Sequence, residues 1–165
     1  MKVGLAADHA GSELRDILRE HIRGLGHEVV DHGGAARADD DYPLIVTPLA
    51  RALAKGEVDR AIFVCGSGIG PAIAANKIPG VRATAATEEW SARDAVTHVD
   101  VNLLTLGQRV IGSELAKSIV EAYLGAKPEG GRHARRREQI AALEGDQATH
   151  RRPERGGLVE DPASR

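Results

Sequence analysis

The chain has 165 residues, a formal net charge of −2 and one cysteine. This length fits a single domain with a substantial core, and the near-neutral charge gives no overall electrostatic case for nucleic-acid binding. A lone cysteine excludes an internal disulfide and suits a reducing compartment. No apolar stretch approaches the ~20 residues of a membrane span, and the N-terminal apolar run is too short for a signal peptide. We therefore expect a soluble, cytoplasmic protein without a nucleic-acid or membrane partner.

Strand-like apolar runs alternate with segments of helical period along most of the chain. The predicted strands are 2–7, 27–30, 61–64, 81–85 and 103–106, and the predicted helices are about 12–25, 42–55, 71–77, 91–96, 113–124 and 133–143. This alternation is typical of an α/β fold, and we predict a three-layer sandwich around a five-stranded parallel sheet of flavodoxin-like order 2-1-3-4-5, with a C-terminal helix. The domain is expected to span 1–145. Residues 146–165 lack apolar periodicity, which predicts a disordered tail.

The third predicted strand ends in Cys65 and runs directly into the glycine-rich loop Gly66-Ser67-Gly68-Ile69-Gly70. Glycines let backbone N–H groups turn inward, and a helix start, predicted at Pro71, adds a partial positive charge. Such a loop can hold an anion, and a thiol beside it is a candidate base or nucleophile. The alternative is a buried structural cysteine next to a tight turn.

Asp8 and His9 directly follow the first predicted strand. In the predicted order the first and third strands are neighbours where the chain reverses direction, and ligands bind at that crevice beyond the carboxyl ends of the strands. The Asp8-His9 loop and the Cys65 loop would then share one site. The alternative for this polar pair is a cap of the following helix.

His98 and the arginines of the last predicted helix are weaker candidates. A lone histidine is usually a satisfied or solvent-facing residue. Arg132 and Arg136 are four residues apart and would share a helix face that suits a phosphate dianion, or that is simply a solvated basic face. Metal-ligand spacing, a P-loop and a dinucleotide fingerprint are absent, so we expect neither metal nor cofactor. The function that is left after these exclusions is acid–base catalysis on a phosphorylated small molecule.

With these residues assembled, the sequence resembles the ribose-5-phosphate isomerase B family, which includes the galactose-6-phosphate isomerase subunits, from Lys2 to about Leu143. The resemblance rests on six motifs: Ala7-Asp8-His9-Ala10-Gly11, Asp41-Tyr42-Pro43, Cys65-Gly66-Ser67-Gly68-Ile69-Gly70, Ala74-Ala75-Asn76-Lys77, Gly107-Gln108-Arg109-Val110-Ile111-Gly112 and Gly130-Gly131-Arg132-His133.

The resemblance implies a metal-independent aldose–ketose isomerase of phosphorylated sugars that works through a cis-enediolate, with ribose 5-phosphate and ribulose 5-phosphate as the expected pair. It implies that Cys65 is the base and that His98 opens the furanose ring. The implied substrate-binding residues are Asp8, His9, Gly66, Ser67, Gly68, Ile69, Gly70, Arg109, Arg132 and Arg136. It also implies a homodimer or a dimer of dimers with shared sites, so that His98 and some arginines act across the interface.

Val99 departs from the family pattern, because an asparagine usually follows the ring-opening histidine. Valine has no hydrogen-bond donor to offer a substrate. We therefore expect that ribose 5-phosphate is turned over without being the best substrate, and a tetrulose 4-phosphate or a hexose 6-phosphate is the alternative. A non-catalytic phosphosugar-binding module on the same fold, or a nucleotide-binding flavodoxin-like domain, would be a different class of protein.

Overall fold

The structure is a computed structural model that describes residues 1–33 and 41–147. The part of the predicted tail from residue 148 onward lies outside the described residues. Five strands are formed: β1 (Lys2–Ala7), β2 (Glu28–Asp31), β3 (Arg60–Cys65), β4 (Ala83–Ala85) and β5 (Leu103–Gly107). The helices are α1 (Ser12–Gly24), α2 (Tyr42–Ala54), α3 (Ile69–Ala75), α4 (Glu89–Val99), α5 (Ser113–Gly125) and α6 (Arg132–Gln147), with a 3₁₀ turn η1 (His9–Gly11) before α1.

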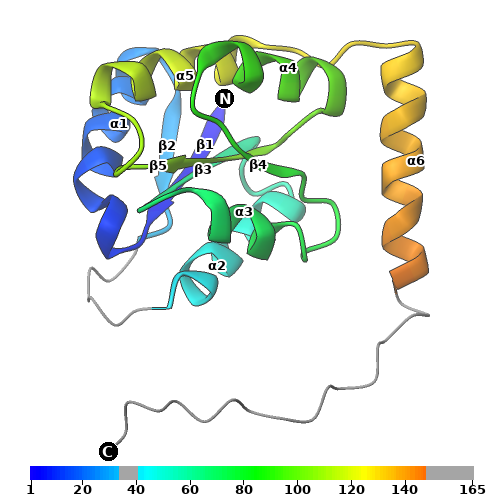
Figure 1. The fold of residues 1–165 in the computed structure, drawn as a ribbon, viewed down its shortest axis with the longest axis horizontal. Coiled ribbons are helices and arrows are strands. Elements are labelled where there is room, and N and C mark those ends of the chain that lie inside the picture. Colours follow the sequence, from blue (N-terminus) through cyan, green and yellow to red (C-terminus); the bar gives the residue numbers. More distant parts are fainter. Residues whose placement is uncertain (34–40, 148–165) are drawn as a thin grey trace, which may run out of the picture.

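The five strands form one parallel sheet in the order β2-β1-β3-β5-β4 (Figure 1). The predicted α/β class and parallel sheet are confirmed, but the order 2-1-3-4-5 is wrong in its last two positions. Every residue of β5 is buried, as expected of a strand covered on both faces. By contrast, β4 has three residues and is only partly buried, which suits an edge.

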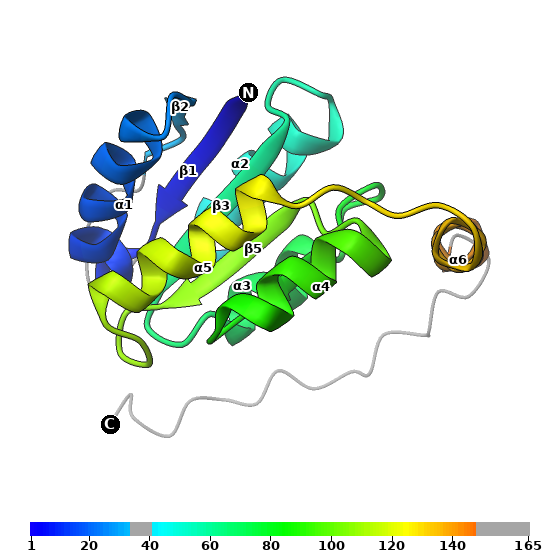
Figure 2. The same cartoon turned by 90° about the horizontal axis from the view of Figure 1, so that it is seen from above.

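Helices cover both faces of the sheet (Figure 2). Helices α1, α4 and α5 pack on one face around the core residues Leu18, Val96 and Tyr123. Helices α2 and α3 pack on the other face, where Leu49 and Ala75 meet Phe63 of β3. The three-layer sandwich is therefore confirmed. No helix in the described ranges is both long and apolar enough to cross a membrane.

Two helices differ from their predicted extent in ways that bear on function. Helix α4 begins at Glu89 rather than 91, because the Glu88 carboxylate accepts hydrogen bonds from the N–H groups of Trp90 and Ser91 at its start. It continues to Val99, so His98 lies in its last turn and not in a loop. Helix α6 runs to Gln147 and stands beside α4, apart from the sheet (Figures 1 and 2).

Candidate active site

The sheet register brings three loops together at the carboxyl edge of the sheet. Ala7 of β1 pairs with Val64 of β3, and Cys65 pairs with Gly107 of β5. The residues that follow these strands, including Asp8, the Cys65 loop and Arg109, are therefore neighbours. The prediction that the Asp8-His9 loop lies beside the Cys65 loop is therefore confirmed.

A cavity of about 390 Å³ opens at this edge. Seven of the predicted site residues line it: Asp8, His9, Cys65, Gly66, Ser67, Gly70 and Arg109. The remaining lining residues are Ala10, Tyr42, Pro71 and Val110. Gly68 caps the N-terminus of α3, and Ile69 is the first residue of that helix.

Cys65 is held at the floor of this cavity. Its side chain is 5% exposed, and its sulfur accepts a hydrogen bond of 3.0 Å from the Gly68 N–H. Gly68 has a φ of +83°, a left-handed conformation that glycine adopts without strain. The buried Thr105 hydroxyl donates to the Gly68 carbonyl at 2.6 Å and fixes the loop from below. The thiol therefore sits in a set position with an N–H donor directed at its sulfur.

Asp8 and the basic residues surround the thiol in different ways. Asp8 is buried, and one of its carboxylate oxygens accepts from the Ala10 N–H at 2.9 Å, so it does cap the following turn. It also lines the cavity, so the capping and site readings are compatible. His9 and Arg109 are exposed at the rim. The Arg109 N–H donates to the Gly66 carbonyl at 3.1 Å, which ties the two loops together.

Gly107 is placed where a side chain would collide with the Cys65 loop. A Cβ there would lie 2.7 Å from the Ser67 carbonyl carbon, a backbone atom that has little freedom to move. We expect Gly107→Ala to displace the loop and lower kcat/KM at least about tenfold, with a stability loss of about 1–3 kcal/mol, typical of overpacking. Steady-state kinetics and thermal unfolding measure both effects. Gly112→Ala is the control, because a Cβ there meets nothing within 4 Å; equal activity of the two variants would contradict this view.

Tyr42 is a cavity residue that sequence reasoning treated only as a helix start and as part of a motif. Its ring packs on Gly70, where an added Cβ would come within 2.6 Å of the ring. This contact closes the cavity wall between α2 and α3. The sequence signal was slight: an aromatic residue at the predicted start of a helix, in a chain with four aromatic residues.

The other predicted site residues, His98, Arg132 and Arg136, do not line the Cys65 cavity. Helix α4 runs back from the carboxyl edge toward the amino edge of the sheet, so its last turn places His98 away from Cys65 (Figure 1). There His98 stacks on His133 of α6, with ring centroids 4.0 Å apart and planes 10° from parallel. The predicted residues thus form two groups within one chain.

His133 is the centre of the second group. Burial lowers its pKa, and electrostatic interaction with His98 and Arg132 lowers it further. Its Nε2 accepts a hydrogen bond of 3.2 Å from Arg132 Nε, which needs a lone pair on that nitrogen. The Glu129 carboxylate lies 3.7 Å from the same nitrogen. Arg132 and Arg136 are both exposed on α6.

His98, Glu129 and His133 bring three donor atoms within 4.8 Å of one another. A metal ion needs lone pairs that converge on one point, whereas the lone pairs of two parallel stacked imidazoles lie side by side. Arg132 also already donates to His133 Nε2. This donor set therefore does not fit a metal ion.

Comparison with known proteins gives the family. Residues 3–140 match the family model described as Ribose/Galactose Isomerase. The chain is 46% identical to ribose-5-phosphate isomerase B of Escherichia coli over 143 residues, which is 87% of this chain and 96% of that protein. It is 36% identical to D-erythrulose-4-phosphate isomerase 2 of Mycolicibacterium smegmatis over 128 residues, 76% of this chain and 84% of that protein.

A solved structure agrees with these matches. Ribose-5-phosphate isomerase B of Clostridium thermocellum superposes with a TM-score of 0.86 at 41% sequence identity, over 89% of this chain and 99% of that one. The family match over residues 3–140 includes the Cys65 loop and the first part of α6. The chain therefore belongs to the Ribose/Galactose Isomerase family.

Proposed function

We propose that the protein interconverts ribose 5-phosphate and ribulose 5-phosphate, with Cys65 as the base. The observation that supports this most directly is the buried Cys65 sulfur, which receives the Gly68 N–H at 3.0 Å on the floor of a cavity that also holds Asp8 and Arg109. A fixed thiol beside backbone N–H donors is suited to moving a proton next to a developing oxyanion. The identities to two ribose-5-phosphate isomerases favour the five-carbon substrate.

The reaction runs through a cis-enediolate. The Cys65 thiolate takes the proton from C2 of the open-chain aldose, and the electron pair forms the C1–C2 double bond with charge on O1. The thiol then returns the proton to C1, while the O2 hydroxyl proton passes to O1. The N–H groups of Gly66 to Gly70 would hold the enediolate oxygens, and Ser67 and Asp8 would bind sugar hydroxyls.

The phosphate is proposed to bind between two copies of the chain. His9 and Arg109 stand at the rim of the Cys65 cavity, but they are exposed and few. Arg132 and Arg136, together with His98, lie elsewhere on the same chain and would complete the cavity of a second copy. A homodimer, or a dimer of dimers, would then carry shared sites. The free thiol suits the cytoplasm, where we propose that the enzyme works.

The direct test is the measurement of kcat/KM for four-, five- and six-carbon aldose and ketose phosphates with the full-length protein. We expect turnover of ribose 5-phosphate without added metal, and no thermal stabilisation by nucleotides. A tetrulose 4-phosphate with a higher kcat/KM would favour the alternative named by the Mycolicibacterium relative. A protein that binds these compounds and turns over none of them would refute the isomerase proposal.

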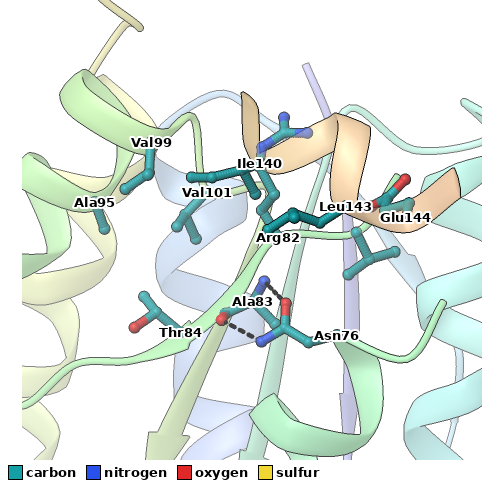
Figure 3. A pocket seen from close by; sticks show the side chains of 11 residues that line it. Asn76, Arg82, Ala83, Thr84, Ala95, Val99, Val101, Ile140, Leu143 and Glu144 are labelled. Carbon is teal, nitrogen blue, oxygen red and sulfur yellow. Dashed lines mark hydrogen bonds between the residues drawn. The ribbon is translucent and has the colours of Figure 1, made fainter. Parts of the chain in front are cut away.

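Val99 decides how strongly ribose 5-phosphate is preferred. Its side chain lies in a groove between α4, β4 and α6, beside Val101 and Ile140, and packs against the core (Figure 3). An apolar packing partner therefore accounts for valine here, but the side chain supplies no donor to a substrate on the neighbouring His98.

We predict that Val99→Asn shifts the ratio of kcat/KM toward ribose 5-phosphate over four-carbon substrates, because the amide adds a donor beside the ring-opening histidine. The half-buried amide also costs about 1 kcal/mol of stability. Val99→Ala is the control, because it shortens the side chain without adding a donor and should leave the ratio unchanged. A wild-type enzyme that already prefers ribose 5-phosphate, and that loses activity with asparagine, would contradict this prediction.

A further inference from the structure

Asp94 and His98 form a close pair on α4, one helical turn apart. Asp94 Oδ1 lies 2.7 Å from His98 Nδ1, and the two side chains are 31% and 40% exposed. We propose that Asp94 is a positioning residue that orients the His98 imidazole for opening the furanose ring of the substrate. This inference rests on the proposed function, in which His98 performs that step.

Two contacts together set the His98 ring. Stacking on His133, at 4.0 Å and 10°, sets the plane of the ring. The Asp94 carboxylate then favours the tautomer that carries its proton on Nδ1, because a negative oxygen 2.7 Å away repels an Nδ1 lone pair.

The other charged groups around this pair come from α6 and the loop before it. Arg132 and Glu129 both face His133, and the Arg137 guanidinium donates to the His98 backbone carbonyl at 3.3 Å. Asp94 is thus the group that directly contacts a His98 ring nitrogen.

The fixed tautomer leaves Nε2 with a free lone pair. That nitrogen can take the proton of the O1 hydroxyl while the C1–O4 bond breaks and the C1 carbonyl forms. The same imidazolium then gives its proton to O4, and the open-chain aldehyde results with no net change in charge. The opposite tautomer would place the Nδ1 lone pair against the carboxylate and protonate Nε2, so it could not begin this sequence.

The chemistry of the substrates determines when Asp94 matters. Ribose 5-phosphate cyclises because its C4 hydroxyl can close on C1. Ribulose 5-phosphate would need O5 to close on C2, and that oxygen carries the phosphate, so this sugar stays open. A tetrose 4-phosphate is open for the same reason, because O4 is phosphorylated. Asp94 should therefore affect turnover of the ribose 5-phosphate and ribulose 5-phosphate pair, in which one partner cyclises, and leave a four-carbon pair almost unchanged.

The experiment compares initial rates with ribose 5-phosphate and with a tetrose 4-phosphate. We expect Asp94→Ala to lower kcat from ribose 5-phosphate by roughly 5- to 20-fold, the range of one partly exposed charge-assisted contact, with KM little changed. Since no variant changes the equilibrium constant, kcat/KM from ribulose 5-phosphate should fall by a similar factor. The rate with the tetrose 4-phosphate should fall less than about twofold, because this sugar is already open. Asp94→Asn should recover part of the loss, because its amide oxygen can still accept from Nδ1.

A matched control lies on two other helices of the same layer. His21 Nε2 and Glu121 Oε1 form a second histidine–carboxylate pair, at 2.9 Å between α1 and α5. Glu121→Gln removes that charge without touching either group of site residues, and we expect it to change neither rate.

Two further measurements separate this inference from the proposed function. Imidazole ¹⁵N NMR of the neutral His98 ring should show a proton on Nδ1 in the wild type and a mixture of tautomers in Asp94→Ala. Asp94→Ala should also add little to the defect of His98→Ala, because the two residues act as one unit. Equal losses with ribose 5-phosphate and the tetrose 4-phosphate, additive defects or an unchanged tautomer would overturn the role of Asp94 and leave the isomerase intact. A wild type without isomerase activity would instead refute the proposed function.

Discussion

Cys65→Ala is expected to abolish most isomerase turnover and leave sugar-phosphate binding in place. Removing a positioned base costs about 10²–10⁴ in rate, and the thiol is the group held at the cavity floor by the Gly68 N–H. The basic rim residues His9 and Arg109 remain, so the dissociation constant of ribulose 5-phosphate should change only a few-fold. Coupled kinetics and titration calorimetry measure these two quantities on the same protein sample.

Cys65→Ser is the matched variant for this test. Serine keeps an acceptor for the Gly68 N–H and nearly the same shape, but an alcohol is a far weaker source of the anionic base at neutral pH. Its turnover should therefore resemble that of the alanine variant, while thermal unfolding of all three proteins should remain close. Turnover that survives in both variants would exclude the thiol as the base.

The arrangement of the sheet could be predicted from local pattern except at one edge. Strand lengths and apolar runs predicted all five strands, because each is a short segment bounded by polar or glycine residues. The exchange of β4 and β5 depends on which strand is covered on both faces. Both β4 and β5 carry apolar residues. Which of the two is the more buried therefore depends on how the whole chain packs and not on either segment alone.

The Cys65 half of the site was predictable because its residues follow strands directly. A residue that ends a parallel strand must lie at the carboxyl edge of the sheet. Because β1 pairs with β3, the loops that follow these two strands are neighbours. Tyr42 was not predicted as a cavity residue, because it reaches the cavity from a helix start by packing on Gly70. The two residues are 28 positions apart in the sequence, so neither local sequence pattern indicates their contact.

The separation of His98 from Cys65 could be derived neither from spacing nor from composition. It follows from α4 extending to Val99, which puts His98 at the far end of a helix that runs antiparallel to the strands. The sequence resemblance already implied a site shared between copies. A site shared between copies requires that one chain alone does not bring all of its residues together. The Cys65 cavity of a single chain meets this requirement, because it lacks His98, Arg132 and Arg136.

Mixing two inactive variants should therefore restore activity. One variant is Cys65→Ala, and the other is His98→Ala. If each site takes its thiol from one copy and its imidazole from the other, a mixed dimer carries one site with both defects and one intact site. Random assortment makes half of the dimers mixed, so about a quarter of wild-type activity should return from ribose 5-phosphate.

The controls decide whether recovery comes from sharing. Each variant refolded alone should stay inactive, and sedimentation should show oligomers at the assay concentration. A mixture of Cys65→Ala with the double variant Cys65→Ala/His98→Ala should recover nothing, because no copy supplies a thiol. Recovery that fails in true mixed oligomers would place Cys65 and His98 in the same subunit's site. That outcome would require α4 to move His98 to the opposite edge of its own sheet, which the packing of Val96 and Ala92 in the core opposes.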